Sequence, residues 1–137
     1  MTPDEIPEAA PDELAFSLSW EDDDGGLRGE LTAVNVGDRL VRLTGKPGVT
    51  PIGTDGVPLD TLTAVTLEMR SPGYVVLAPG ARATATVWWG AWDGPPAGDS
   101  ARITWEGEAE AGVTGPLQPE RREGATNLSS SWFARAD

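Results

Sequence analysis

Apolar and polar residues alternate along several short stretches of the chain. From Leu14 to Trp20, leucine, phenylalanine and tryptophan occupy every second position, with alanine and serine between them. The stretch from Ala81 to Trp89 is the most regular. Trp89 falls there on the side that carries alanine and valine, whereas Trp88 falls on the side that carries arginine and threonine. A period of two is typical of strands that bury one face.

Clusters of glycine, proline, asparagine and aspartate separate these stretches at the spacing expected of a β-sandwich. We expect strands over residues 14–20, 27–36, 39–43, 62–69, 74–77, 81–89, 101–106 and 128–134, and loops over 51–58 and 107–123. The turn cluster at residues 22–26 tolerates positive φ and predicts a hairpin between the first two strands. The predicted core holds large residues from the apolar faces: Phe16, Leu18, Leu31, Leu67, Val87, Trp89, Ile103 and Trp105.

The length of 137 residues suits one domain, and the charge divides it into two parts. Nine of the 22 acidic residues lie in the first 24 positions, where there is no basic residue. Residues 1–12 also contain three prolines. Spaced prolines and charge repulsion predict a disordered acidic arm over 1–12 that contributes little to stability, followed by a single domain over 13–137.

The absence of histidine and cysteine excludes whole classes of chemistry. A Ser-His-Asp triad, a thiol nucleophile, a zinc knuckle, an iron–sulfur cluster and a disulfide all need one of these residues. We therefore expect no catalytic residue, cofactor or metal site. Adjacent basic residues occur only at Arg121 and Arg122, so no nucleic-acid partner is expected.

No run of 18 apolar residues is present, so direct membrane insertion is not expected either. With Met1 as the native start and no signal peptide after it, the chain is expected in the cytoplasm. If Met1 instead heads an excised domain, an extracytoplasmic location follows. The pattern gives no oligomeric state.

An ordered set of short motifs lies between residues 35 and 89. It comprises Asn35-Val36-Gly37, then Leu43-Thr44-Gly45-Lys46-Pro47-Gly48-Val49, then Gly56-Val57-Pro58-Leu59, then Leu77-Ala78-Pro79-Gly80-Ala81-Arg82-Ala83, and ends at Trp88-Trp89. In order and spacing this set resembles a mainly actinobacterial family, domain-of-unknown-function family 4232. The resemblance implies an all-β, immunoglobulin-like β-sandwich of seven to nine short antiparallel strands. It implies no activity.

Two further implications of the resemblance concern location and disulfides. Relatives are often exported or attached to a membrane, and they commonly carry a cysteine where this chain has Val41, with a partner cysteine further on. This chain has no cysteine. A disulfide is therefore impossible here, which weakens the implication of an exported location.

Carboxylates are the remaining candidates for chemistry. A glycosidase pair needs two convergent acids, but acids such as Glu30 and Glu68 fall at outward strand positions. The acidic run Asp22-Asp23-Asp24-Gly25 lacks the EF-hand spacing, because Trp20 and Leu31 occupy ligand positions. A solvated hairpin turn accounts for that run better than a calcium site does. A carboxylate-based hydrolase is therefore a remote alternative.

Six tryptophans are the most informative feature for function. Trp20, Trp89 and Trp105 fall on apolar faces and are expected in the core. Trp88, on a polar face, and Trp92, in a loop, are the candidate partner-binding residues, because exposed tryptophan is a common hot spot. The leading hypothesis is a non-catalytic protein-interaction or structural module. The alternative is a carbohydrate-binding module that stacks sugars on these two indoles.

Overall fold

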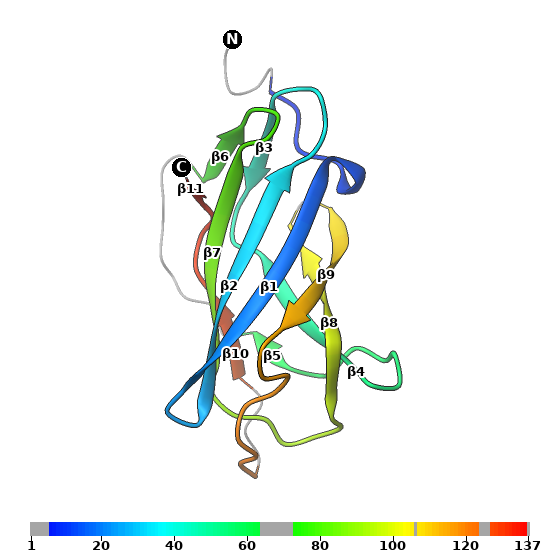
Figure 1. The fold of residues 1–137 in the computed structure, drawn as a ribbon, viewed down its shortest axis with the longest axis vertical. Coiled ribbons are helices and arrows are strands. Elements are labelled where there is room, and N and C mark those ends of the chain that lie inside the picture. The colour runs from blue at the N-terminus through cyan, green and yellow to red at the C-terminus, as the bar shows by residue number, and fades with distance from the viewer. Residues whose placement is uncertain (1–5, 64–72, 106, 124–126, 137) are drawn as a thin grey trace.

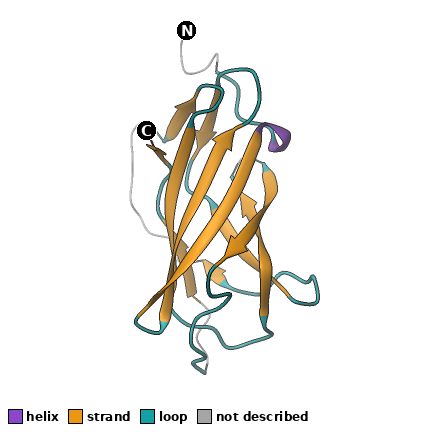
Figure 2. Cartoon of the chain, in the orientation of Figure 1, coloured by secondary structure: helices purple, strands orange, loops and turns teal. Residues whose placement is uncertain are grey.

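The structure is a computed structural model that describes residues 6–63, 73–105, 107–123 and 127–136. Within these ranges the protein is all-β, with one short 3-10 helix at Pro11–Glu13 (Figure 2). The strands are β1 (Leu14–Asp23), β2 (Gly26–Asn35), β3 (Val41–Thr44), β4 (Gly48–Gly53), β5 (Leu62–Thr63), β6 (Tyr74–Leu77), β7 (Arg82–Trp89), β8 (Ala97–Thr104), β9 (Glu108–Thr114), β10 (Asn127–Ser130) and β11 (Ala134–Ala136). The all-β prediction is confirmed.

Nine of these strands form one sheet that curls nearly into a barrel, and β3 and β6 form a small second sheet (Figure 1). The order in the large sheet is β4-β8-β9-β1-β2-β7-β10-β5, and β11 pairs with the other part of the same edge of β7. The β1–β9 and β10–β5 pairs are parallel and the others are antiparallel. The curl brings β10 back towards β4, where the Ser130 hydroxyl donates a hydrogen bond of 2.6 Å to the Pro47 carbonyl.

The predicted hairpin of β1 and β2 forms over the full length of both strands, from Leu14 opposite Asn35 to Asp23 opposite Gly26. Asp24 and Gly25 make the two-residue turn, with φ of 53° and 91°. Two positive φ angles give a turn whose twist matches that of the paired strands, and aspartate followed by glycine is a preferred sequence for it.

Asn35 shows why the Asn-x-Gly and Leu-x-Pro-Gly motifs occur together. Its buried carboxamide donates to the carbonyls of Arg39 (2.8 Å) and Leu77 (3.0 Å), and its Oδ1 accepts from the Gly37 N–H. The Asn35 backbone also bonds to Gly80 and Ala81 at the entrance to β7. One side chain therefore shapes the turn after β2 and fixes it to the end of β6.

The core lies inside the curled sheet and around Trp89. This indole is fully buried, and its ring centroid is 6.1 Å from that of Trp20 and 5.7 Å from that of Trp92. Gly29 makes room for Trp20, because a Cβ at this position would lie 2.7 Å from the indole ring. Tight contact with a ring at the backbone accounts for a glycine in mid-strand.

The core prediction is confirmed for most of its members. The buried ones are Leu18, Leu31, Val87, Trp89 and Ile103. Phe16 and Trp105 are half-buried and pack on each other, with ring centroids 5.0 Å apart. Leu67 lies outside the described residues, as does most of the strand expected over 62–69.

Two predicted loops are wrong in part, because they contain strands. β4 pairs with β8, and β9 pairs with β8 and β1. Their sequences carry proline, glycine, alanine and glutamate, which disfavour strands locally, but pairing with distant strands outweighs this preference. The strand expected over 128–134 divides into β10 and β11. The described ranges therefore contain eleven strands, where seven to nine were expected for the chain.

The described part of the acidic arm is attached to the domain, which corrects the expectation of a disordered arm. Ile6 and Ala9 are buried. The Ala9 N–H donates to the carbonyl of Arg42 in β3, and the Arg42 N–H donates to the Pro7 carbonyl. The Glu8 carboxylate accepts hydrogen bonds from the Thr44 N–H at 2.9 Å and from the Thr44 hydroxyl. Glu8 therefore has specific partners on the domain, and the described part of the arm is held against it.

Replacement of Trp89 and of Trp88 by alanine should lower stability by very different amounts. Trp89→Ala empties a buried aromatic site and should lower the free energy of unfolding by about 3–5 kcal/mol. Trp88→Ala changes an exposed side chain and should lower it by less than about 1 kcal/mol. Chemical denaturation of both variants measures the difference. Equal, large losses would show that both rings are buried.

Removal of residues 6–12 should destabilise the domain. A chain that begins at Glu13 should melt about 5 °C or more below a chain that begins at Ile6. The shorter chain loses two buried apolar side chains and the hydrogen bonds to β3. We expect this loss to lower the free energy of unfolding by about 2 kcal/mol. Calorimetry of the two truncated chains measures the shift. Melting temperatures within a degree of each other would show that residues 6–12 contribute little to stability, as expected of a detached arm.

Candidate functional site

Trp88 lies on the outer face of the sheet, as its position in the alternation predicts. It is 42% exposed, whereas the residues on either side of it in β7 are fully buried. The register places it directly between Arg28 of β2 and Ser129 of β10. Directly opposed residues have Cβ atoms about 5 Å apart, so these three side chains form one surface.

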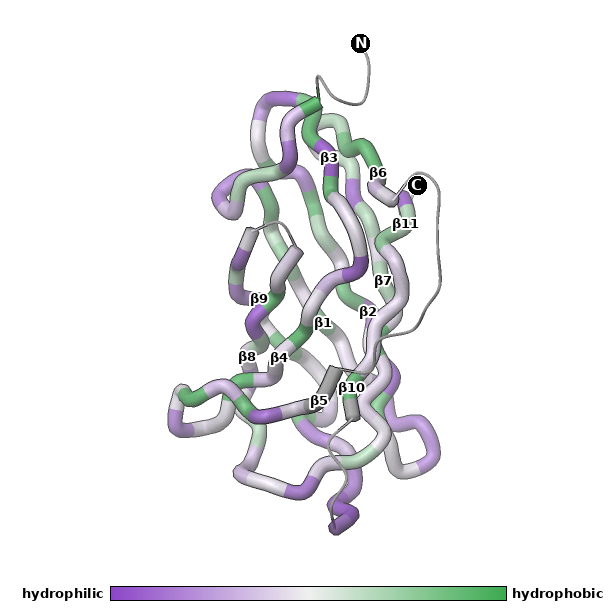
Figure 3. The backbone as a smooth tube through the Cα atoms, turned by 180° about the vertical axis from the view of Figure 1, so that it is seen from behind, coloured by the Kyte–Doolittle hydropathy of each residue, from purple (hydrophilic) through white to green (hydrophobic). Residues whose placement is uncertain are grey.

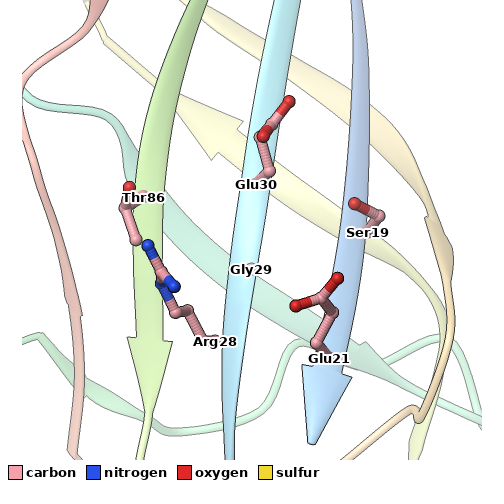
Figure 4. A pocket seen from close by; sticks show the side chains of 6 residues that line it. All are labelled: Ser19, Glu21, Arg28, Gly29, Glu30 and Thr86. Atoms are coloured by element: carbon pink, nitrogen blue, oxygen red, sulfur yellow. The ribbon is translucent and has the colours of Figure 1, made fainter. Parts of the chain in front are cut away.

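The neighbouring row of the same face holds a shallow hollow of about 180 Å³ (Figure 4). Its lining comes from β1, β2 and β7: Ser19, Glu21, Arg28, Gly29, Glu30 and Thr86. The short side chains of Ser19 and Thr86 leave space between the longer charged ones. Figure 4 shows the Arg28 side chain extending from β2 towards β7, with Glu30 further along β2 and Glu21 on β1. We call this surface, together with Trp88, the Trp88 face.

The charges on the Trp88 face are mixed and open to solvent. Arg28, Glu21 and Glu30 are exposed, and none of them forms an ion pair within the described part of the chain. A carboxyl that acts as a general acid is usually buried among apolar groups. Glu21 and Glu30 have no such surroundings. The Trp88 face therefore presents one indole among solvent-exposed charged groups of both signs.

Trp92 is not on the surface, which corrects the expectation that its loop position exposes it. It is 3% exposed and packs against Trp89, and its Nε1 donates to the Pro95 carbonyl at 2.7 Å. Gly94 lies on the ring, since a Cβ there would be 2.5 Å from the indole. Trp88 and Trp92 therefore do not make a platform of two exposed indoles.

Three loops meet around Trp92 and bury it. Its backbone bridges to Arg121 in the loop between β9 and β10, and the N–H of Glu120 in that loop donates to the carbonyl of Gly25 in the β1–β2 turn. Arg121 also pairs with Asp93 at 3.1 Å. These contacts join positions far apart in the sequence, so no local pattern around Trp92 indicates its burial.

Glu13 and Arg39 form the best-defined pair of charged groups. The guanidinium donates two hydrogen bonds to the carboxylate, at 2.6 and 2.8 Å, and the Ala10 N–H donates a third at 2.9 Å. The bonds from Arg39 and then from Ala10 lower the pKa of Glu13 to about 2. The same pairing raises the pKa of Arg39. This pair holds the short helix at residues 11–13 against the turn after β2, which is a structural role.

Clustered metal ligands and long apolar helices are both absent from the described ranges. No cluster of three or more histidine, cysteine, aspartate or glutamate side chains there is suited to hold a metal ion. No helix in the same ranges is long and apolar enough to cross a bilayer.

The fold and this site define an all-β domain with an exposed, polar sheet face centred on one tryptophan. The chain belongs to the family described as domain of unknown function (DUF4232), whose model matches residues 10–132. The match covers most of the chain and extends well beyond the motifs between residues 35 and 89. No curated protein and no solved structure matches the chain significantly.

Replacement of Glu13 by glutamine should alter the response to acid. Because the pKa of Glu13 is lowered on folding, the ionised carboxylate stabilises the fold above its ordinary pKa of 4.5, and this contribution is lost as the pH falls towards 2. Glu13→Gln should therefore be less stable than the wild type at pH 7, and the two should converge near pH 2. Urea unfolding at several pH values measures this, with Glu30→Gln as the control. A constant difference across the range would contradict the assignment.

Proposed function

We propose that this domain is a non-catalytic protein-interaction module and that the Trp88 face is its binding surface. The observation that carries the proposal is an indole that is 42% exposed near the end of β7, at a position paired with a strand on each edge. The backbone beneath it is bonded to strands on both sides, so binding would immobilise few groups. Tryptophan and arginine are the residues most enriched in interface hot spots, and here Trp88 and Arg28 are neighbours.

We also infer an immunoglobulin-like arrangement within the curled sheet. The connectivity supports two layers, β1-β2-β7 and β9-β8-β4, joined by the parallel β1–β9 pair. In an immunoglobulin sandwich strands A, B and E share one sheet, and strands C, F and G share the other. Here β1, β2 and β7 can correspond to A, B and E, and β4, β8 and β9 to C, F and G. An experimental structure in which β9 pairs with β2 instead of β1 would remove this correspondence.

A pull-down experiment tests the interaction proposal. The wild-type domain and the variants Trp88→Ala and Val36→Ala are immobilised and exposed to an extract of the cells that produce the protein. Val36 is 58% exposed and serves as the matched apolar control. A hot-spot residue contributes about 2 kcal/mol or more, or about thirtyfold in Kd. Quantitative mass spectrometry should find proteins retained by the wild type and the control and lost with Trp88→Ala. Identical retention by all three would refute the proposal.

Carbohydrate binding is the alternative outcome. A panel of soluble glycans, followed by tryptophan fluorescence, distinguishes it from protein binding. A glycan that changes the fluorescence of the wild type but not of Trp88→Ala would favour sugar stacking on this indole.

A further inference from the structure

A groove of about 320 Å³ lies between the β4–β5 loop, residues 54–61, and the β7–β8 loop, residues 90–96. Val57, Pro58 and Pro95 are exposed on its walls, and the buried Trp92 lies beneath them. Val57 is 57% exposed, one of the largest values for an apolar side chain in the described part of the molecule. This surface is separate from the residues that line the hollow beside Trp88.

The wall that carries Val57 is held in place by its own hydrogen bonds. The Gly53 N–H donates to the Val57 carbonyl at 2.8 Å, the Val57 N–H to the Asp55 carboxylate at 3.1 Å, and the Leu59 N–H to the Pro51 carbonyl at 2.9 Å. The Leu59 side chain is buried and anchors the loop to the core. The valine is therefore presented by a bonded loop. A preformed surface loses little conformational entropy when it is occupied.

The opposite wall is fixed to Trp92. The indole N–H of Trp92 donates to Pro95, and the β4–β5 loop is joined to this wall by a hydrogen bond of 3.2 Å from the Thr54 N–H to the Pro96 carbonyl. The two walls are therefore held at a set separation.

The charge on the groove is negative. Asp55, Asp60 and Asp93 line it, and no lysine or arginine is among its lining residues. Asp93 pairs with Arg121, whereas Asp55 and Asp60 are exposed and form no ion pair within the described ranges. Figure 3 shows hydrophobic and hydrophilic positions alternating along the β4–β5 loop. An occupant that fits must combine apolar surface with positive charge.

We propose that this groove docks a lysine- or arginine-containing segment of a partner protein. Long cationic side chains cover apolar surface with their methylene stems and keep the charged end in water. The stem of such a side chain lies along Val57 and Pro95, and its charged end lies at Asp55 and Asp60. The net charge of −12 on the whole chain also favours the approach of a basic partner. This proposal does not depend on the Trp88 face.

Titration of the isotope-labelled full chain with a capped peptide, Ac-Gly-Lys-Pro-Lys-Gly-NH2, tests it. Amide NMR spectra should show saturable shifts at the Val57 N–H and at the indole N–H of Trp92. A peptide with norleucine in place of both lysines should bind more weakly, and added salt should weaken the lysine peptide. Absence of shifts at these two groups would overturn the proposal.

Matched variants identify the groups that bind. Asp55→Asn combined with Asp60→Asn should weaken the lysine peptide about threefold, the range for exposed ion pairs. Asparagine keeps the oxygen that accepts the Val57 N–H, so the loop should keep its shape. Val57→Ser should also weaken binding, whereas the controls Asp38→Asn and Val36→Ser, at exposed positions in the turn after β2, should not.

Two more titrations distinguish docking in this groove from attraction to charge alone and from binding at the Trp88 face. Spermidine offers the charge without the peptide. If it binds as tightly as the lysine peptide and Val57→Ser makes no difference, the groove is only an acidic surface and the proposal fails. Trp88→Ala should leave the peptide titration unchanged. Loss of peptide binding in that variant would transfer the site to the Trp88 face and also overturn the proposal.

Discussion

The hydrogen-bonded register of β7 determines which of its side chains face the core and which face the outer surface of the sheet. β7 is bonded to β2 along eight positions on one edge, and to β10 and β11 on the other. In a strand, neighbouring side chains point to opposite faces. Trp89 therefore enters the core between Trp20 and Trp92, and Trp88 must stand outside beside Arg28. A slip of one residue would exchange them, so the same backbone bonds fix the core and the exposed indole.

The parts of the fold that could be predicted are those in which local pattern and burial agree. β1, β2 and β7 alternate cleanly, and the Asp-Gly turn fixes the hairpin. β4 and β9 were not predicted because their residues have weak or contrary strand preference, and only distant partners hold them in the sheet. In the arm, prolines and acids suggested detachment, whereas Glu8 has specific partners on the domain.

The candidate site was predictable to the same extent. The exposure of Trp88 follows from the period of its own strand. The position of Arg28 beside it could not be predicted, because it depends on which strands pair and in which register. Trp92 shows the opposite limit. A loop position favours exposure, but contacts among three loops enclose the ring and leave an acidic groove above it. Sequence patterns report strand faces well and report the packing of loops poorly.

The attachment of residues 7–9 to β3 has a consequence for the behaviour of the protein at high concentration. An uncovered strand edge presents free N–H and C=O groups to which a strand of another molecule can add. Here Pro7 and Ala9 occupy both backbone groups of Arg42 on the edge of β3 that is not paired with β6. Residues 7–9 therefore protect this edge from the addition of a foreign strand. Their proteolytic removal would leave the edge open to aggregation while the rest of the domain is still folded.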